Sequence, residues 1–482
     1  MTSNNDVNTT PKAGTEPTLK RVLKLPHLVF YGIAYIVPLA FFETYGLVQQ
    51  ETHGMHSLAF LLTSVAMGFT AFSYSKMVKA YPVAGSVYTY VGKAINPHAG
   101  FLSGWLILMG YMLLPMFTYL VMAMYLNQMF PMIPYKVFLL ALIALTAYVC
   151  YRGIEITVRV SSIAVILQII FIGAIFFFII RWLAMGFGNA CAFDWTAFYN
   201  REEFVKDGMG IPMLFSAASL LAMAFLGFDA ISTLSEEALR PEKDIGRAII
   251  LTSVIMGAFF VVMSFYLTMA WPNAWFEIKD PDVGSYEFMD KVCGPTMAYL
   301  FGTVYVFGGF ASAVDCQTSA ARILFSMGRD HILPPKVFAH IHPKYRTPSY
   351  NAIIIAVISL VALFVSLENA AELVNFGALI GFTLVNLSVI AHYYVREKKR
   401  GLYNTMSYLV APLAGAAFTF SVWCGLGSFA KILGGVWLGI GAVYLVIKTK
   451  GFRELPPEMN EDVDLSLYNV DGETETDQDK QK

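Results

Sequence analysis

Charged residues are scarce in this sequence. Only 14% of its 482 residues are Asp, Glu, Lys or Arg, whereas a typical soluble domain has roughly 25%. Hydrophobic residues make up 57% of the chain, and the mean hydropathy is +0.58. No polar stretch is longer than a loop or a tail. The composition therefore excludes a soluble globular protein and predicts an all-α polytopic membrane protein.

Cysteines are few, and the common catalytic motifs are missing. The five cysteines are scattered, without a CxxC pair or the spacing of metal ligands. No GxSxG, phosphate-binding loop or HExxH pattern occurs where its mechanism would need it. We therefore expect no enzyme activity, no metal, no cofactor and no nucleic-acid partner. The polar first 26 residues also lack the apolar core and cleavage site of a signal peptide.

Twelve long apolar runs are present instead. Each is near or above the roughly 20 residues that a helix needs to cross a lipid bilayer, with the fourth and ninth the shortest. They cover about residues 28–50, 57–79, 99–127, 135–151, 160–184, 210–235, 246–271, 294–324, 350–366, 370–395, 405–425 and 430–448. We therefore predict twelve spans within a transporter domain at 27–450.

Basic residues divide unequally between the two sides of these spans. With the N-terminus in the cytoplasm, 26 of the 33 Lys and Arg residues fall inside and 7 outside. Cytoplasmic loops of membrane proteins carry such an excess. The split predicts a multi-pass membrane protein with both termini cytoplasmic. The flanking segments are an N-terminal tail at 1–26 and an acidic tail at 455–482, which we expect to be disordered.

The sixth span carries an acid within its apolar run. In the stretch Phe225 to Glu237, Asp229 follows Gly227, which lets the backbone leave helical geometry. An acid at the centre of a span costs roughly 2.5–3.5 kcal/mol and normally faces a cavity or a partner. We interpret this stretch as the discontinuous helix of a transporter. A plain span whose Asp229 is satisfied by a neighbouring helix is the alternative.

The first span has the same character. Gly32 and Pro38 interrupt it, and Glu43 follows inside the apolar stretch. Two broken spans, five apart, are the best sequence indication of an inverted-repeat transporter with a site near the bilayer midplane. We therefore predict a five-plus-five (LeuT-type) inverted repeat. Its halves would be about 27–184 and 210–396, followed by two extra helices at about 405–448.

Four stretches carry a family resemblance. They are Pro82-Val-Ala-Gly-Ser-Val-Tyr-Thr-Tyr90, Phe225-Leu-Gly-Phe-Asp-Ala230 with Thr233-Leu-Ser-Glu-Glu237, Met327-Gly-Arg-Asp330, and Asn375-Phe-Gly-Ala-Leu379. Together they resemble the amino acid–polyamine–organocation (APC) transporter superfamily, most closely its bacterial putrescine importers, over about residues 20–450. The resemblance implies a location in the cytoplasmic membrane of a bacterium. The chain departs from those importers at Glu43, where they have Asp, at Gly110, where they have Asp, and at Asp315, where they lack an acid.

The acids and aromatics near the breaks are the candidate binding residues. A diamine needs acids near both ends, because an unpaired buried ammonium is costly, and it favours aromatic faces. The candidate substrate-binding residues are Tyr35, Glu43, Tyr111, Phe225, Asp229 and Asp315. For any single aromatic residue, ordinary packing is the alternative. A zwitterionic amino acid would need only one acid, with its carboxylate on the exposed amides between Gly32 and Pro38.

The sequence says less about which ion gradient drives transport than about the binding residues. Glu236 and Glu237, after the sixth span, are candidates for a proton relay, or they cap that helix end and pair with Arg240 or Arg247. Sodium coupling is the alternative. The residues and the resemblance together predict a proton-coupled importer of an organic amine, most of all putrescine. An amino-acid permease or an amine/amino-acid exchanger is the alternative, and a membrane receptor is disfavoured.

Overall fold

The computed structural model describes residues 21–82, 86–152, 157–189, 194–206, 210–235, 237–329, 332–345 and 347–456. These residues form helices and loops without a named β-strand. Within these described ranges, eleven helices or helix groups are long and apolar enough to cross a membrane, and a shorter apolar one covers Ser349–Leu363. The predicted all-α polytopic fold is confirmed. The Met-Gly-Arg-Asp motif ends on Asp330, and that residue lies outside the described ranges, as does most of the acidic tail.

Most spans are single long helices. In chain order they are α3 (His56–Ala80), α5 (Pro97–Met129), α6 (Tyr135–Arg152), α7 (Thr157–Ala184), α10 (Pro241–Ala270), α13 (Pro295–Arg329), α15 (Ser349–Ser359) with η8 (Leu360–Leu363), α16 (Leu367–Val389) with η9 (Ile390–Arg396), α17 (Leu402–Thr405) with η10 (Met406–Val410) and α18 (Ala411–Cys424), and α19 (Ser428–Lys448).

The first and sixth spans are broken, as predicted. The first consists of α1 (Leu25–Ile36), η1 (Pro38–Phe42) and α2 (Tyr45–Glu51). The sixth consists of α9 (Gly210–Leu221), η4 (Ala222–Phe225) and η5 (Asp229–Leu234). Pro38 has no backbone N–H to continue α1, and Gly227 has a φ of +123°, which side chains other than glycine rarely adopt.

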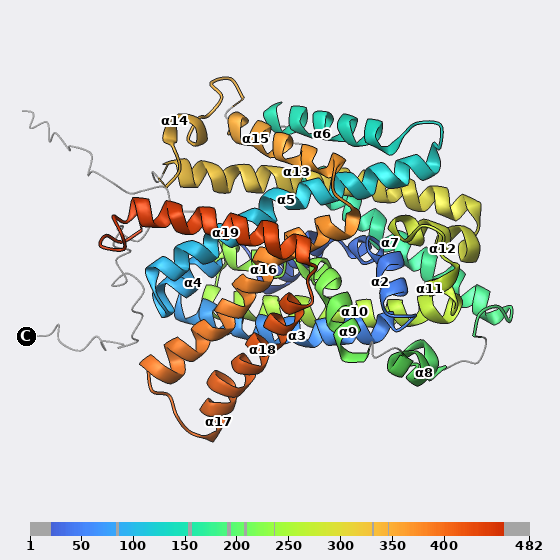
Figure 1. The fold of residues 1–482 in the computed structure, drawn as a ribbon, viewed down its shortest axis with the longest axis horizontal. Helices are drawn as coiled ribbons and strands as arrows, with labels where there is room; N and C mark the ends of the chain where they lie inside the picture. The colour runs from blue at the N-terminus through green and yellow to red at the C-terminus, as the bar shows by residue number, and fades with distance from the viewer. Residues whose placement is uncertain are drawn as a thin grey trace, which may run out of the picture.

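Corresponding spans of the two predicted repeats pack against each other. The second span, α3, packs along the seventh, α10, and the third, α5, packs along the eighth, α13. In Figure 1, α5 and α13 run side by side, and α3 and α10 form a neighbouring pair. The connections also correspond, because α4 (Ser86–Ala94) links spans 2 and 3, while α11 (Ala274–Glu277) and α12 (Gly284–Phe288) link spans 7 and 8.

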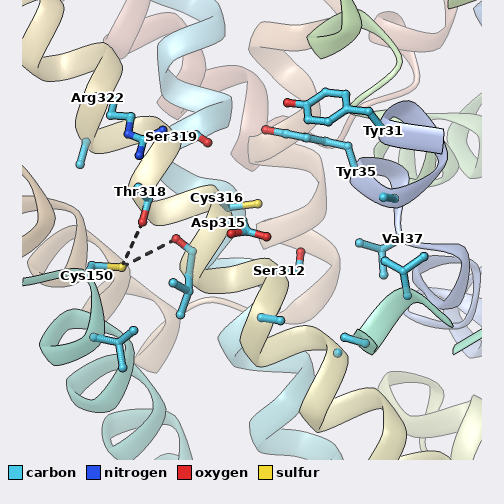
Figure 2. Close-up of a pocket in the computed structure, with 18 of the residues that line it drawn as sticks. Tyr31, Tyr35, Val37, Cys150, Ser312, Asp315, Cys316, Thr318, Ser319 and Arg322 are labelled. Carbon is cyan, nitrogen blue, oxygen red and sulfur yellow. Dashed lines mark hydrogen bonds between the residues drawn. The ribbon is translucent and has the colours of Figure 1, made fainter. Parts of the chain in front are cut away.

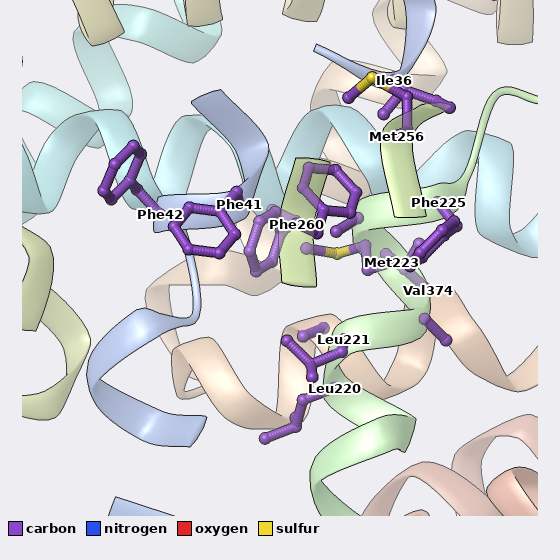
Figure 3. Packing of buried hydrophobic residues seen from close by; sticks show 14 of the residues in the cluster. Ile36, Phe41, Phe42, Leu220, Leu221, Met223, Phe225, Met256, Phe260 and Val374 are labelled. Carbon is purple, nitrogen blue, oxygen red and sulfur yellow. The ribbon is translucent and has the colours of Figure 1, made fainter. Parts of the chain in front are cut away.

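An aromatic core joins the two broken spans. Phe260 of α10 packs 5.9 Å from Phe41 of η1 and 5.3 Å from Phe225 of η4, measured between ring centroids. Figure 3 shows these rings together within the buried cluster. Outward-facing residues of the peripheral helices, such as Ile170 and Ile447, are 65% and 70% exposed. Apolar side chains on an outer face suit contact with lipid tails.

Candidate functional site

The two helix breaks meet in the middle of the molecule. A Cβ placed on Gly227 would lie 2.4 Å from Cδ1 of Tyr35 and 3.2 Å from the backbone nitrogen of Ile36. The break of the sixth span therefore rests directly on the end of α1. Only glycine permits this approach, because any side chain would displace the Tyr35 ring.

Gly32, which we predicted to be a break, lies inside the continuous helix α1. That prediction was wrong. A Cβ on Gly32 would lie 2.5 Å from Cδ1 of Ile231 and 2.9 Å from Cγ2 of Thr252. The glycine permits α1 to pack closely against η5 and α10. The backbone instead departs from helical geometry at Val37, which has a φ of 57° and precedes Pro38.

Asp229 lies in a small pocket at this junction. The pocket has a volume of about 30 Å³, enough for about one or two water molecules. The Asp229 carboxylate accepts a hydrogen bond from the backbone N–H of Gly227, with 3.2 Å between nitrogen and oxygen, and it also interacts with the Tyr111 hydroxyl. The lining residues are Tyr35, Ile107, Gly110, Tyr111, Leu114, Leu226, Gly227, Asp229, Ala378 and Phe382. The structure thus brings three predicted site residues, Tyr35, Tyr111 and Asp229, to one place.

Asp315 lies in a much larger cavity beside the pocket. This cavity has a volume of about 690 Å³ and lies between α1, α6, α7 and α13. Figure 2 shows Tyr31 and Tyr35 projecting from α1 toward α13, which carries Ser312, Asp315 and Ser319. The cavity reaches His27 near the start of α1 and Thr347 in the loop before α15. It therefore extends to the side of the molecule on which α1 begins.

The two carboxylates share one electrostatic neighbourhood. The phenol of Tyr31 lies within electrostatic range of both Asp315 and Asp229. The Tyr31 and Tyr35 rings have centroids 6.0 Å apart, as expected for residues four apart on one helix. A cation in this region would lie within electrostatic range of carboxylates from two spans and beside aromatic faces of a third, which is a chemically suitable environment for an organic amine.

Glu43 lies elsewhere. It is 9% exposed and accepts a hydrogen bond of 2.5 Å from the Tyr305 hydroxyl of α13. Beside it, Tyr125 of α5 donates to the carbonyl of Phe42 at 3.3 Å, and Ser285 of α12 donates to the same carbonyl. Glu43 is absent from the lining of both cavities. This network connects the part of the first span that follows the break to α5, α12 and α13.

Phe225 and Glu237 line neither of the two cavities. Phe225 is fully buried in the aromatic core and lines neither of them. Glu236 lies outside the described residues. The backbone carbonyl of Glu237 accepts hydrogen bonds from the N–H groups of Val22 and Leu23, at 2.9 and 3.0 Å. This contact joins the segment before α1 to the segment after η5.

Sequence reasoning missed two cavity residues. Tyr31 and Arg322 both line the large cavity. Arg322 follows Asp315 by seven residues on α13, which places both on one helix face about 10 Å apart along the axis. The spacing of seven could have predicted that Arg322 shares a helix face with Asp315. The spacing of four could likewise have predicted that Tyr31 shares a face with Tyr35.

Among the described residues outside the spans, three carboxylates have shifted pKa values. Burial, with Asp280 and Glu368 nearby, raises the pKa of Asp282 to about 6. A hydrogen bond from His53 holds the pKa of Glu203 below its usual value, and Lys291 does the same for Glu277. The structure places all three in the connections between spans, away from the two cavities.

Comparison with known proteins identifies the family. The amino acid permease family model matches residues 30–452. The chain is also 36% identical over 455 residues to the low-affinity putrescine importer PlaP of Escherichia coli K12, covering 94% of this chain and 98% of that protein. This chain belongs to the amino acid permease family. The resemblance seen in the sequence is therefore confirmed.

Other proteins similar to this chain are named for different substrates. The permease is 27% identical over 466 residues to the branched-chain amino acid permease BcaP of Bacillus subtilis, covering 91% of this chain and 95% of that protein. It is 24% identical over 413 residues to cationic amino acid transporter 7 of Arabidopsis thaliana, covering 81% and 68%. Family membership and the apolar helices together make this chain a multi-pass membrane transporter.

Proposed function

We propose that this permease is a secondary active importer of an organic amine, most of all putrescine. The observation that carries the proposal is the placement of Asp229 and Asp315 on either side of Tyr35, beside the helix breaks. The similarity to a putrescine importer over nearly the whole chain supports it. Substrate would cross by alternating access around this site, and the protein itself would catalyse no chemical reaction.

The chemistry of a diamine suits these residues. Putrescine carries two ammonium groups joined by a short apolar linker, so each end needs an acceptor when water is removed. Asp229 would take one ammonium and Asp315 the other. Tyr35 and Tyr111 would supply aromatic faces and hydroxyls, and a cation over an aromatic face gains about 0.5–2 kcal/mol. Because Glu43 lines neither cavity, its binding role would require a state other than this one.

The distribution of basic residues supports a cytoplasmic opening for the large cavity. With both termini in the cytoplasm, the large cavity opens toward the cytoplasm, because it extends to the start of α1. This state would be the one that releases substrate into the cell. The contact of Glu237 with Val22 and Leu23 lies at that same end, where movement of α1 against η5 would open or close the exit.

Proton symport is the coupling we favour. A carboxylate inside a membrane protein can carry a proton, because desolvation disfavours its charged form. Glu237 is the described candidate for a relay near the exit, where it would carry the proton while Asp229 holds the ammonium. Sodium coupling is the alternative for the driving ion.

One observation favours a second substrate class. Arg322 lines the same cavity as Asp315, and its guanidinium would donate two hydrogen bonds to a carboxylate. A molecule with an amine at one end and a carboxylate at the other could use both residues. This arrangement supports an amino-acid permease or an amine/amino-acid exchanger as the alternative function.

Uptake into proteoliposomes tests the proposal. Labelled putrescine is offered with and without an inward proton gradient, in the presence of unlabelled cadaverine, spermidine, lysine, arginine or neutral amino acids. Gradient-dependent uptake that diamines block and amino acids do not block supports amine import. Uptake that depends on an internal amino acid, or on sodium, would replace the proposal with exchange or sodium coupling.

A further inference from the structure

Tyr35 separates the two carboxylates. Among the residues that the structure describes, it is the one that lines both the cavity of about 690 Å³ and the pocket of about 30 Å³. Asp315 lines the first and Asp229 the second. A molecule in the large cavity therefore meets Asp315 directly, whereas the Tyr35 ring stands between that molecule and Asp229.

The contact with Gly227 fixes the position of the ring. A Cβ on Gly227 would lie only 2.4 Å from Cδ1 of Tyr35, so the ring rests on the bare backbone of the second break. No space for a substrate atom exists between them. The pocket on the far side has room for about one or two water molecules, which is too small for a diamine while the ring stays in place.

The backbone next to Tyr35 is strained. Val37, two residues later, has a φ of 57°, and a β-branched residue rarely adopts a positive φ. Such conformations cost on the order of 1–3 kcal/mol and occur at switch regions. Release of this strain would turn the end of α1, and the Tyr35 ring would move with it.

We propose that Tyr35 is a movable partition that controls passage between Asp229 and the large cavity. An ammonium group passes between Asp315 and Asp229 only when the ring leaves Gly227. In the closed position the ring prevents released substrate from returning to Asp229. The identity of the cation rests on the proposed function, but the partition itself does not depend on it.

Thiol labelling of the purified full-length protein tests the partition. The five native cysteines are replaced by alanine, because Cys150 and Cys316 line the large cavity. Leu114→Cys then reports on the small pocket, and Ser312→Cys reports on the large cavity, since each residue lines only that space. The probe is a trimethylammonium methanethiosulfonate, and the readout is the rate of modification.

We expect Leu114→Cys to react at least tenfold more slowly than Ser312→Cys while Tyr35 is intact. Tyr35→Ala should raise the Leu114→Cys rate by tenfold or more, whereas Tyr35→Phe should leave it slow because the ring remains. Tyr31→Ala is the matched control, since Tyr31 lines only the large cavity. Equal rates with Tyr35 intact, or no change in Tyr35→Ala, would overturn the proposal.

A second arm separates this inference from the proposed function. Added putrescine should slow the modification of Ser312→Cys if the cavity binds diamines. If putrescine has no effect but the Tyr35→Ala result holds, the partition stands and the amine assignment falls. If putrescine protects but Tyr35→Ala changes nothing, the assignment stands and the partition falls.

Discussion

Replacement of Asp229 by Asn is the most informative perturbation of the site. The two side chains have nearly the same shape, and Asn keeps an oxygen that can accept from the Gly227 N–H, now 3.2 Å away. The fold should therefore survive while the negative charge is lost. Asp229 is only 6% exposed, so little water is present to replace that charge beside a bound ammonium.

The expected size of the effect follows from this burial. Removal of one partner from a buried ion pair costs about 3–5 kcal/mol. At ~1.4 kcal/mol per decade, this is about a 100- to 4,000-fold loss of putrescine affinity. Uptake at low putrescine concentration should fall in the same proportion.

The assay is equilibrium binding of labelled putrescine to detergent-purified protein, followed by uptake into proteoliposomes. A melting curve that matches that of the wild type controls for folding, and Ser64→Ala on α3 serves as a control outside both cavities. Wild-type affinity and uptake in Asp229→Asn would refute the assignment of Asp229 as an ammonium site.

Three further outcomes are expected. Glu43→Gln should weaken putrescine binding far less than Asp229→Asn, since Glu43 lines neither cavity; an equal loss would place it in the site. Gly32→Ala should destabilise the protein by about 1–3 kcal/mol through overpacking, whereas Gly68→Ala, with nothing within 4 Å, should not; similar melting temperatures would contradict this. The pKa of Asp282 is raised to about 6, so its folded state binds the proton more tightly and stability falls as pH rises from about 4 to 6. Asp282→Asn should therefore melt higher than the wild type at pH 7.5, with a gap that shrinks toward pH 4, and a pH-independent gap would contradict this reasoning.

The fold could be predicted because its signals are local. The apolar runs give the spans, and Pro38 and Gly227 mark breaks through their own backbone chemistry. Gly32 shows the limit of this reasoning. Its role comes from Ile231 and Thr252, which approach α1 from other spans, and no local pattern distinguishes a packing glycine from a hinge glycine.

The candidate site was only partly predictable for the same reason. The cost of an acid inside a membrane span marks Glu43, Asp229 and Asp315 as candidate functional residues. That cost does not indicate which side of its helix each residue faces. Glu43 is satisfied by Tyr305, 262 residues later. In contrast, Arg322 shares a helix face with Asp315, and helical spacing alone could have found it.

Displacement of labelled putrescine from the purified permease tests the central claim most directly. The competitors are unlabelled putrescine (1,4-diaminobutane), 1-aminobutane and 4-aminobutanoate, which all have a four-carbon chain. If Asp229 and Asp315 each hold one ammonium, the diamine should compete at least tenfold better than the monoamine, because the diamine makes two ammonium–carboxylate contacts and the monoamine makes only one. The amino acid should compete poorly. Equal competition by the monoamine would contradict the two-acid site, and stronger competition by 4-aminobutanoate would assign the cavity to a zwitterion held between Asp315 and Arg322.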